Sequence, residues 1–292
     1  MTLSVPLFVE LCAGTAALSL RLHRRSARPP VSRMGAKTGY ADAVLRVLGL
    51  RPGQGAAHYH WCEPDPGVRL LLEAYRDPDL AREAASIIRG WVDEEPRALW
   101  ERLRAEGPPR GADPGDVGVP PREVARWAWV QRRTHPGNER SFLHQVPVKP
   151  VADPAQQGHR WTPEQPAPLF EALPLMPATI TPDARGIEPG PDLPPGTVVY
   201  ADPPYMGTTG YGNDLPRADV VALARRWAAA GATVAISEAE PIGDLTADGW
   251  SAVNITGQRV GSKRTFSRQQ AEWVTMNRPP AWTPSEQCGL FG

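Results

Sequence analysis

The chain has 292 residues with 32 Lys+Arg and 32 Asp+Glu, so its formal net charge is zero. This length is enough for one core with an insertion, or for two domains. A neutral chain has no global positive field, so any contact with nucleic acid must come from local basic patches. The apolar runs are too short to span a membrane and no secretory leader is present, which predicts a soluble, cytoplasmic protein without membrane contact.

The three cysteines, Cys12, Cys62 and Cys288, lie far apart in the chain and lack the spacing of metal ligands. This pattern indicates reduced intracellular thiols. We therefore expect neither a disulfide framework nor a metal site.

The N-terminal segment predicts a strand over 3–11, a turn of small residues over 12–15 and a helix over 16–22. In such a turn the backbone approaches a ligand closely, and the first turn of the helix offers unpaired N–H groups. The pattern lacks the three glycines of a dinucleotide fingerprint. Taken alone, it fits a nucleotide cradle and an ordinary strand-to-helix turn about equally well.

A basic segment, 32–40, contains Lys37 and leads into a helix predicted over 41–50. It is either a ligand-facing loop or a solvated one. The next predicted strand, 58–62, ends in Glu63. A carboxylate at the end of a second strand can accept hydrogen bonds from both hydroxyls of a ribose.

Residues 66–165 have a different composition, with helical segments rich in Arg and Trp between Pro/Gly loops. In the segment 126–138 we expect the arginines to bind phosphates and read guanines, while Trp127 and Trp129 fill the core face of a helix. A solvated helix face remains the alternative for any single arginine.

The apolar run 197–201 predicts a buried strand, which is followed directly by Asp202, Pro203, Pro204 and Tyr205. Two successive prolines cannot continue a strand and donate no backbone hydrogen bonds. This set of groups suits an exocyclic amine. Asp202 and the Pro203 carbonyl can accept its two N–H bonds, while the Tyr205 ring can stack on a base.

The C-terminal part predicts a helix over 217–231, strands over 233–237 and 250–256, and a last antiparallel strand over 271–277 that begins near Glu272. The loop 259–268 between the last two strands is basic and has the composition of a phosphate clamp.

These features together resemble the Dam-like DNA adenine-N6 methyltransferases over nearly the whole chain. Residues 10–17 are similar to the first motif of that family, with Cys12 in place of the usual Phe and Ala16 in place of the second Gly. We expect these two changes to weaken cofactor binding without abolishing it. The segment around Lys37 resembles a Gly-Gly-Lys element that usually precedes the first motif.

The resemblance implies a Rossmann-like class I methyltransferase fold, with a mixed, mostly parallel seven-stranded sheet and a helical insertion. The catalytic core would be discontinuous, over 1–66 and 166–278. The insertion at 67–165 would recognise the target, and 279–292 would form a tail.

The resemblance also assigns residues to S-adenosylmethionine and to double-stranded DNA. Those expected at the cofactor are Glu10, Cys12, Ala13, Gly14, Thr15, Lys37, Glu63, Asp183 and Asp202. Those expected at DNA are Arg126, Arg132, Arg133, Asn138, Arg259, Lys263, Arg264 and Arg268. Asp202, Pro203, Pro204 and Tyr205 form the expected catalytic set.

The expected function is site-specific transfer of a methyl group from S-adenosylmethionine to N6 of a flipped-out adenine in DNA. Methylation of cytosine at N4 is the enzymatic alternative. A catalytically degenerate module that binds DNA is the alternative from another class. The C-terminal residues Gln287, Leu290 and Phe291 resemble a peptide that docks on a replication sliding clamp, although the apolar pair also suits packing on the protein's own surface.

Overall fold

The computed structural model describes residues 5–31, 37–109, 118–134, 142, 166–205, 215–260 and 271–284. The chain divides into two compact units. The first contains Met1–Ala27, Lys37–Asp65 and Met176–Gly292, and the second contains Arg28–Ala36 and Pro66–Leu175. The second unit thus extends to Leu175, ten residues past the expected boundary at 165, because the helix α7 (Pro166–Glu171) packs on α4 (Pro78–Gly90).

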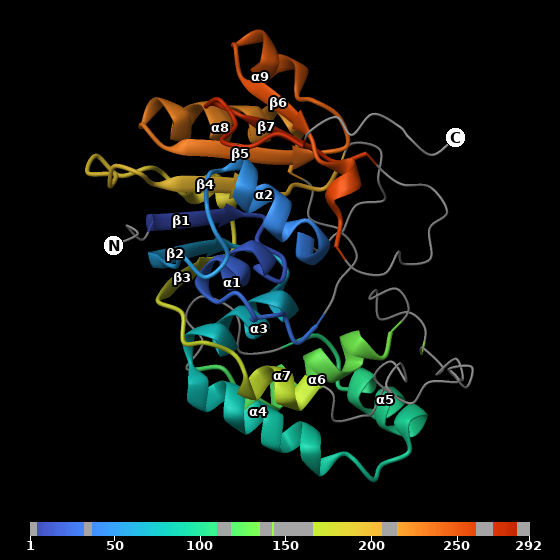
Figure 1. Cartoon of the computed structure of the whole chain (residues 1–292). Helices are drawn as coiled ribbons and strands as arrows, with labels where there is room; N and C mark the ends of the chain where they lie inside the picture. The colour runs from blue at the N-terminus through green and yellow to red at the C-terminus, as the bar shows by residue number, and fades with distance from the viewer. Residues whose placement is uncertain are drawn as a thin grey trace, which may run out of the picture. The chain divides into compact units, whose positions relative to one another are not determined.

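The first unit is built on a twisted sheet that, over the described residues, has seven strands in the order β3-β2-β1-β4-β5-β7-β6 (Figure 1). The strands are β1 (Val5–Leu11), β2 (Ala56–Cys62), β3 (Ala178–Thr181), β4 (Val198–Ala201), β5 (Thr233–Glu238), β6 (Ser251–Asn254) and β7 (Trp273–Met276). Among the strands that the structure describes, β7 alone runs antiparallel to its neighbours, β5 and β6. The prediction of a mixed, mostly parallel Rossmann-like sheet is confirmed.

The two faces of the sheet follow from the alternation of side chains along each strand. Val9 and Leu11 of β1 belong to a buried cluster with Val221 and Trp227 of the helix α8 (Arg217–Ala229). Glu10, between them, lies on the other face and accepts a hydrogen bond from the helix α1 (Ala17–His23). The helix α1 in turn packs on α2 (Ala41–Val47).

Two elements of this unit were not predicted. Strand β3 is only four residues long, lies between Pro177 and Pro182, and keeps its side chains partly exposed. Helix α9 (Gly243–Ala247) has five residues. Neither is long enough to show a periodic apolar pattern in the sequence.

The second unit consists of helices that mostly begin at a proline, which loses no hydrogen bond in the first turn of a helix. Asp77 caps α4, and Glu95 caps α5 (Pro96–Ala105), each by accepting two backbone N–H bonds. The helix α3 (Pro66–Arg76) packs on α4 and α6 (Pro121–Arg132).

Trp127 and Trp129 of α6 are buried, so the prediction that they form the core face is confirmed. The indole of Trp127 lies so close to Gly67 of α3 that a Cβ on this glycine would come within 1.9 Å of the indole nitrogen. Only glycine permits this approach.

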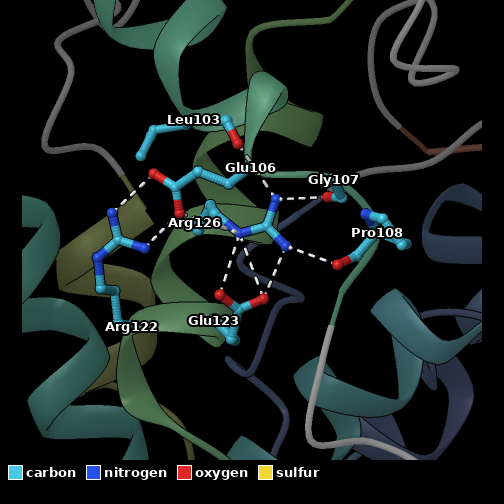
Figure 2. A network of polar contacts seen from close by, with 7 residues as sticks. All are labelled: Leu103, Glu106, Gly107, Pro108, Arg122, Glu123 and Arg126. Atoms are coloured by element: carbon cyan, nitrogen blue, oxygen red, sulfur yellow. Dashed lines mark hydrogen bonds and ion pairs between the residues drawn. The ribbon is translucent and has the colours of Figure 1, made fainter.

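Arg126 joins the end of α5 to α6, as Figure 2 shows. Its guanidinium donates hydrogen bonds to the carbonyls of Leu103, Gly107 and Pro108, and it forms an ion pair of 2.7 Å with Glu123. A buried arginine at the C-terminal end of a helix satisfies carbonyls that the helix itself leaves unpaired. Arg126 is therefore part of the framework of the second unit.

Of the helices that the structure describes, none combines the length and the apolar character that crossing a bilayer requires.

We expect Arg126→Met to destabilise the protein by about 3 kcal/mol, because it leaves the partly buried Glu123 carboxylate and the carbonyls of Leu103, Gly107 and Pro108 without their cation. Urea unfolding followed by tryptophan fluorescence measures the loss. Arg122→Met is the matched control, since Arg122 pairs with Glu106 at the exposed surface and its loss should cost less than about 1 kcal/mol. Equal effects of the two changes would contradict the framework role of Arg126.

Candidate functional site

The carboxyl ends of β1, β2 and β4 meet at one edge of the sheet, and most of the predicted site residues follow these ends. The backbone N–H of Ala13, after β1, donates to the Cys62 carbonyl at 2.8 Å. The N–H of Asp202, after β4, donates to the Leu11 carbonyl at 3.3 Å. Because the chain continues from β1 to β2 on one side and pairs with β4 on the other, this edge is the topological switch point where open α/β sheets bind ligands.

The turn between β1 and α1 has an unusual backbone. Cys12, Gly14 and Ala16 have φ angles of 61°, 51° and 46°, in the left-handed region. No described atom lies within 4 Å of the position that a Cβ on Gly14 would take. The turn therefore presents open backbone at its centre, as a ligand cradle requires.

Ala16, which stands where the family resemblance has a second glycine, has a positive φ. The left-handed conformation costs a non-glycine residue about 1 kcal/mol. Because the Ala16 methyl is fully buried at the start of α1, its burial offsets part of this cost.

Glu63 supports the same turn from the end of β2. One carboxylate oxygen accepts the Gly14 N–H at 2.7 Å, and the other accepts the Asp65 N–H at 3.0 Å. Each carboxylate oxygen has two lone pairs, so it can accept more than one hydrogen bond. Glu63 thus joins the end of β2 to the turn after β1, and its expected contact with a ribose stays a prediction.

Glu10 lies beneath the turn rather than in it. Its side chain is 3 % exposed and accepts the Ser19 N–H at 2.7 Å, and the Ser19 hydroxyl also receives the indole N–H of Trp61. Burial raises the pKa of Glu10 to about 7, against the hydrogen bonds from Ser19 that lower it. Glu10 therefore holds β1 to α1, a supporting position and not a direct contact for a cofactor.

The thiols of Cys12 and Cys62 lie at this edge as free cysteines. Burial raises the pKa of both thiols, that of Cys62 to about 12. They are accordingly protonated and poor nucleophiles.

Asp202 is held by Lys37, which is in the short 3-10 helix η1 (Lys37–Gly39). The Lys37 Nζ atom lies 2.8 Å from Asp202 Oδ1 and 3.5 Å from Glu272 Oε1. The order of the Lys37 segment along the chain is unusual for the family resemblance, yet its ammonium reaches the carboxylate of the Asp-Pro-Pro-Tyr loop.

The electrostatics of this cluster are those of a buried ion triad. Burial raises the pKa of Asp202 to about 6, although Lys37 acts in the opposite direction and Glu272 adds to the rise. For Lys37, burial lowers the pKa, but attraction to Asp202 and Glu272 prevails and the net shift is upward. At neutral pH Asp202 is thus mainly ionised beside an ammonium.

Tyr205 completes the cluster. Its hydroxyl donates to Glu272 Oε1 at 2.6 Å, and the Lys37 Nζ atom lies 4.6 Å from the ring centroid, over one face. Burial raises the pKa of the Tyr205 phenol far above its usual value, so the hydroxyl stays protonated. Residues from three distant segments of the chain therefore meet around one lysine.

Asp183 stands apart from the expected geometry. Its carboxylate is exposed, caps the short helix η3 (Ala184–Gly186) and forms an ion pair of 3.0 Å with Arg185. A contact with the adenine amine of a cofactor would have to compete with these bonds, so the structure gives the assignment of Asp183 less support than that of Glu63.

The arginines expected at DNA differ in exposure. Arg126 and Arg133 are buried, and Arg133 lies over the rings of Trp129 and Phe142. Burial lowers the pKa of Arg133 to about 10. Arg132 is half-buried and donates to the Pro30 carbonyl at 2.9 Å. Arg126 and Arg133 are thus corrected to framework residues, because their guanidinium groups face the interior.

Arg259 is exposed and remains a candidate for phosphate. The N–H of the next residue, Val260, donates to the Gly39 carbonyl, which ties the start of the basic loop to the Lys37 turn. Other predicted contacts lie outside the described residues: Asn138, Lys263, Arg264, Arg268, Gln287, Leu290 and Phe291.

The first part of the C-terminal tail is attached to α2. The Ala281 N–H donates to the Val47 carbonyl at 3.0 Å, and the Trp282 ring lies under the guanidinium of Arg46. Within the tail expected over 279–292, residues 281 and 282 are therefore held by α2, and the expected docking on a sliding clamp stays a prediction.

The sequence assigned no role to Glu272 beyond leading the last strand. A glutamate at the start of a buried strand is a signal, because such a position rarely holds an unpaired charge. Its partners, however, lie 67 and 235 residues away in the chain, and no local pattern links them.

Within the described ranges, no group of three or more His, Cys, Asp or Glu side chains has the arrangement of a metal site. No protein-family model matches the chain, and no curated protein matches it.

The buried Glu10 carboxyl generates a prediction on stability against pH. Its folded pKa of about 7 exceeds the usual 4.5, so the folded state loses stability as pH rises from about 4.5 to 7, where only the unfolded chain ionises freely. Glu10→Gln keeps an acceptor for Ser19 and removes this titration. Relative to wild type, the variant should gain up to about 3 kcal/mol between pH 4.5 and 7.5, measured by urea unfolding. If the free energy of unfolding of wild type and of Glu10→Gln depended on pH in the same way, the raised pKa of Glu10 would be contradicted.

Proposed function

We propose that the protein transfers a methyl group from S-adenosylmethionine to the N6 amino group of adenine in DNA. The observation that carries the proposal is the Asp202 carboxylate, held by the buried Lys37 ammonium at the switch point of the sheet, with the Tyr205 ring beside it. An acceptor, a proline carbonyl and an aromatic ring in this order suit a flipped base with an exocyclic amine.

The residues of the cradle fit the cofactor. The open backbone at Gly14 and the flanking Ala13 and Thr15 would hold it, and Glu63 would accept its ribose hydroxyls. When bound, S-adenosylmethionine supplies an electrophilic methyl group.

The chain itself contributes binding and orientation. Asp202 and the Pro203 carbonyl accept the two N–H bonds of the amine, which favours the pyramidal form whose lone pair is free to react. Lys37 occupies one oxygen of Asp202, so the other oxygen remains for the amine. The ammonium also keeps the carboxylate ionised at neutral pH, which is the state that accepts hydrogen bonds.

The direct test is to incubate the purified protein with labelled S-adenosylmethionine and unmethylated genomic DNA, and to identify the modified base by mass spectrometry. N6-methyladenine is the expected product. N4-methylcytosine would show the other amine as target. Cofactor binding by calorimetry without any transfer would support the degenerate DNA-binding module.

Asp202→Ala should lower the transfer rate by at least 100-fold, because the reacting amine loses a charged acceptor worth about 3 kcal/mol. Single-turnover kinetics measure the effect, and calorimetry should show cofactor affinity largely retained. Asp42→Ala is the matched control, since Asp42 is also a partly buried aspartate in an ion pair, with Arg21. More than about a tenth of wild-type activity in Asp202→Ala would refute the assignment.

Glu63→Ala should weaken S-adenosylmethionine binding by about tenfold or more, because both the ribose acceptor and the support of the Gly14 N–H are removed. Glu63→Gln keeps one acceptor and should lie between wild type and alanine. Isothermal calorimetry with the cofactor alone measures both. Wild-type affinity in the alanine variant would remove Glu63 from the cofactor site.

A further inference from the structure

Glu272 is the buried group of the cluster that the proposed chemistry does not use. It precedes β7, its side chain is 6 % exposed, and a single oxygen serves two partners. Oε1 accepts the Tyr205 hydroxyl at 2.6 Å and faces the Lys37 ammonium at 3.5 Å. One carboxylate oxygen thus links the aromatic ring to the cation.

The backbone of Glu272 is itself firmly held. Its N–H donates to the Thr256 hydroxyl at 2.9 Å, and its carbonyl accepts the Ile255 N–H at 2.8 Å. The Thr256 carbonyl also receives the hydroxyl of Tyr40, close to Lys37 in the chain. The backbone hydrogen bonds thus fix the position of Glu272, and its carboxylate in turn positions Tyr205 and Lys37.

The position of Lys37 makes the two faces of the Tyr205 ring unequal. With Nζ 4.6 Å from the ring centroid, the ammonium closes one face by a cation–π contact. A base can then stack only on the opposite face. The hydroxyl bond to Glu272 fixes the tilt of that face.

We propose that Glu272 is a positioning residue, which holds the Tyr205 ring and the Lys37 ammonium so that a single ring face receives a flipped purine. The inference rests on the proposed function for the identity of the base. Glu272 acts through Tyr205 and Lys37 and has no contact with the reacting amine in this arrangement.

Three variants separate the two bonds of Glu272. Glu272→Gln keeps an acceptor for the Tyr205 hydroxyl and removes the charge that faces Lys37. Tyr205→Phe keeps the ring and removes the hydroxyl. Glu272→Ala removes both bonds. Glu238→Gln is the matched control, because Glu238 is equally buried at the neighbouring end of β5 but pairs with Arg217.

The first readout needs no turnover: the carboxyl of Asp202 is titrated by NMR in protein with ¹³C-labelled aspartate. Glu272→Gln should lower the pKa of Asp202 from about 6, because a like charge is lost and Lys37 turns wholly to Asp202. Glu238→Gln should lower it less. The other ionisable groups facing Asp202 stay unchanged in Glu272→Gln: Glu10, Cys12, Tyr200, Tyr205 and Glu238.

The second readout is the steady-state kinetics on unmethylated genomic DNA. Tyr205→Phe should raise the KM for DNA about fivefold, since the ring that captures the base loses the bond that fixes its tilt. Glu272→Ala should raise it at least as much. The double variant Glu272→Ala/Tyr205→Phe should be no worse than Glu272→Ala, because both changes break the same bond.

An Asp202 titration that is identical in Glu272→Gln and wild type would overturn the inference, as would KM effects of Glu272→Ala and Tyr205→Phe that multiply in the double variant. If Glu272→Ala does not fold, the variants Glu272→Gln and Tyr205→Phe still test the positioning role of Glu272. If the wild-type protein transfers no methyl group, the proposed function is refuted. The NMR titration of Asp202 would still test whether Glu272 positions Lys37 beside Asp202.

Discussion

The site depends on one buried ammonium. Asp202 follows β4 and Glu272 precedes β7, two strands that lie on either side of β5. Two carboxylates in so little water would repel each other and take up protons. Lys37 lies between them and allows both to be placed there. Leaving either carboxylate without its cation would cost several kcal/mol, since a buried charge receives little solvation from water. The loop, the ring and the last strand are therefore arranged around the lysine.

The arrangement also explains why strained backbone is tolerated nearby. The turn from Cys12 to Ala16 contains three left-handed residues, which an isolated segment would not adopt. Glu63 and Glu10 fix the turn from opposite sides, one through the Gly14 N–H and the other through the first turn of α1. The surrounding hydrogen bonds determine the conformation, and the proposed cofactor would therefore meet a backbone that is already ordered.

Much of the fold can be predicted from the sequence, because buried parallel strands form short apolar runs. The runs of β1, β2, β4 and β5 are clear. The ends of these strands can be predicted too, so Glu63 and Asp202 could be placed at the same edge of the sheet. Ion pairs across the fold are different. The partner of Asp202 lies 165 residues earlier, and nothing in the local pattern of Lys37 or Glu272 encodes the pairing. Burial of Arg126 was equally hidden, because an arginine on a polar helix face and one that caps a neighbouring helix look alike in sequence.

The late position of β7 in the chain bears on how the protein is made. This strand enters between β5 and β6, and both are synthesised before it. Until β7 arrives, β5 presents an unpaired edge, and Lys37 and Asp202 lack their third partner. A nascent chain can thus hold a nearly finished sheet with an incomplete site and an exposed edge that invites association with other chains. Completion of the sheet and completion of the site are a single event in synthesis.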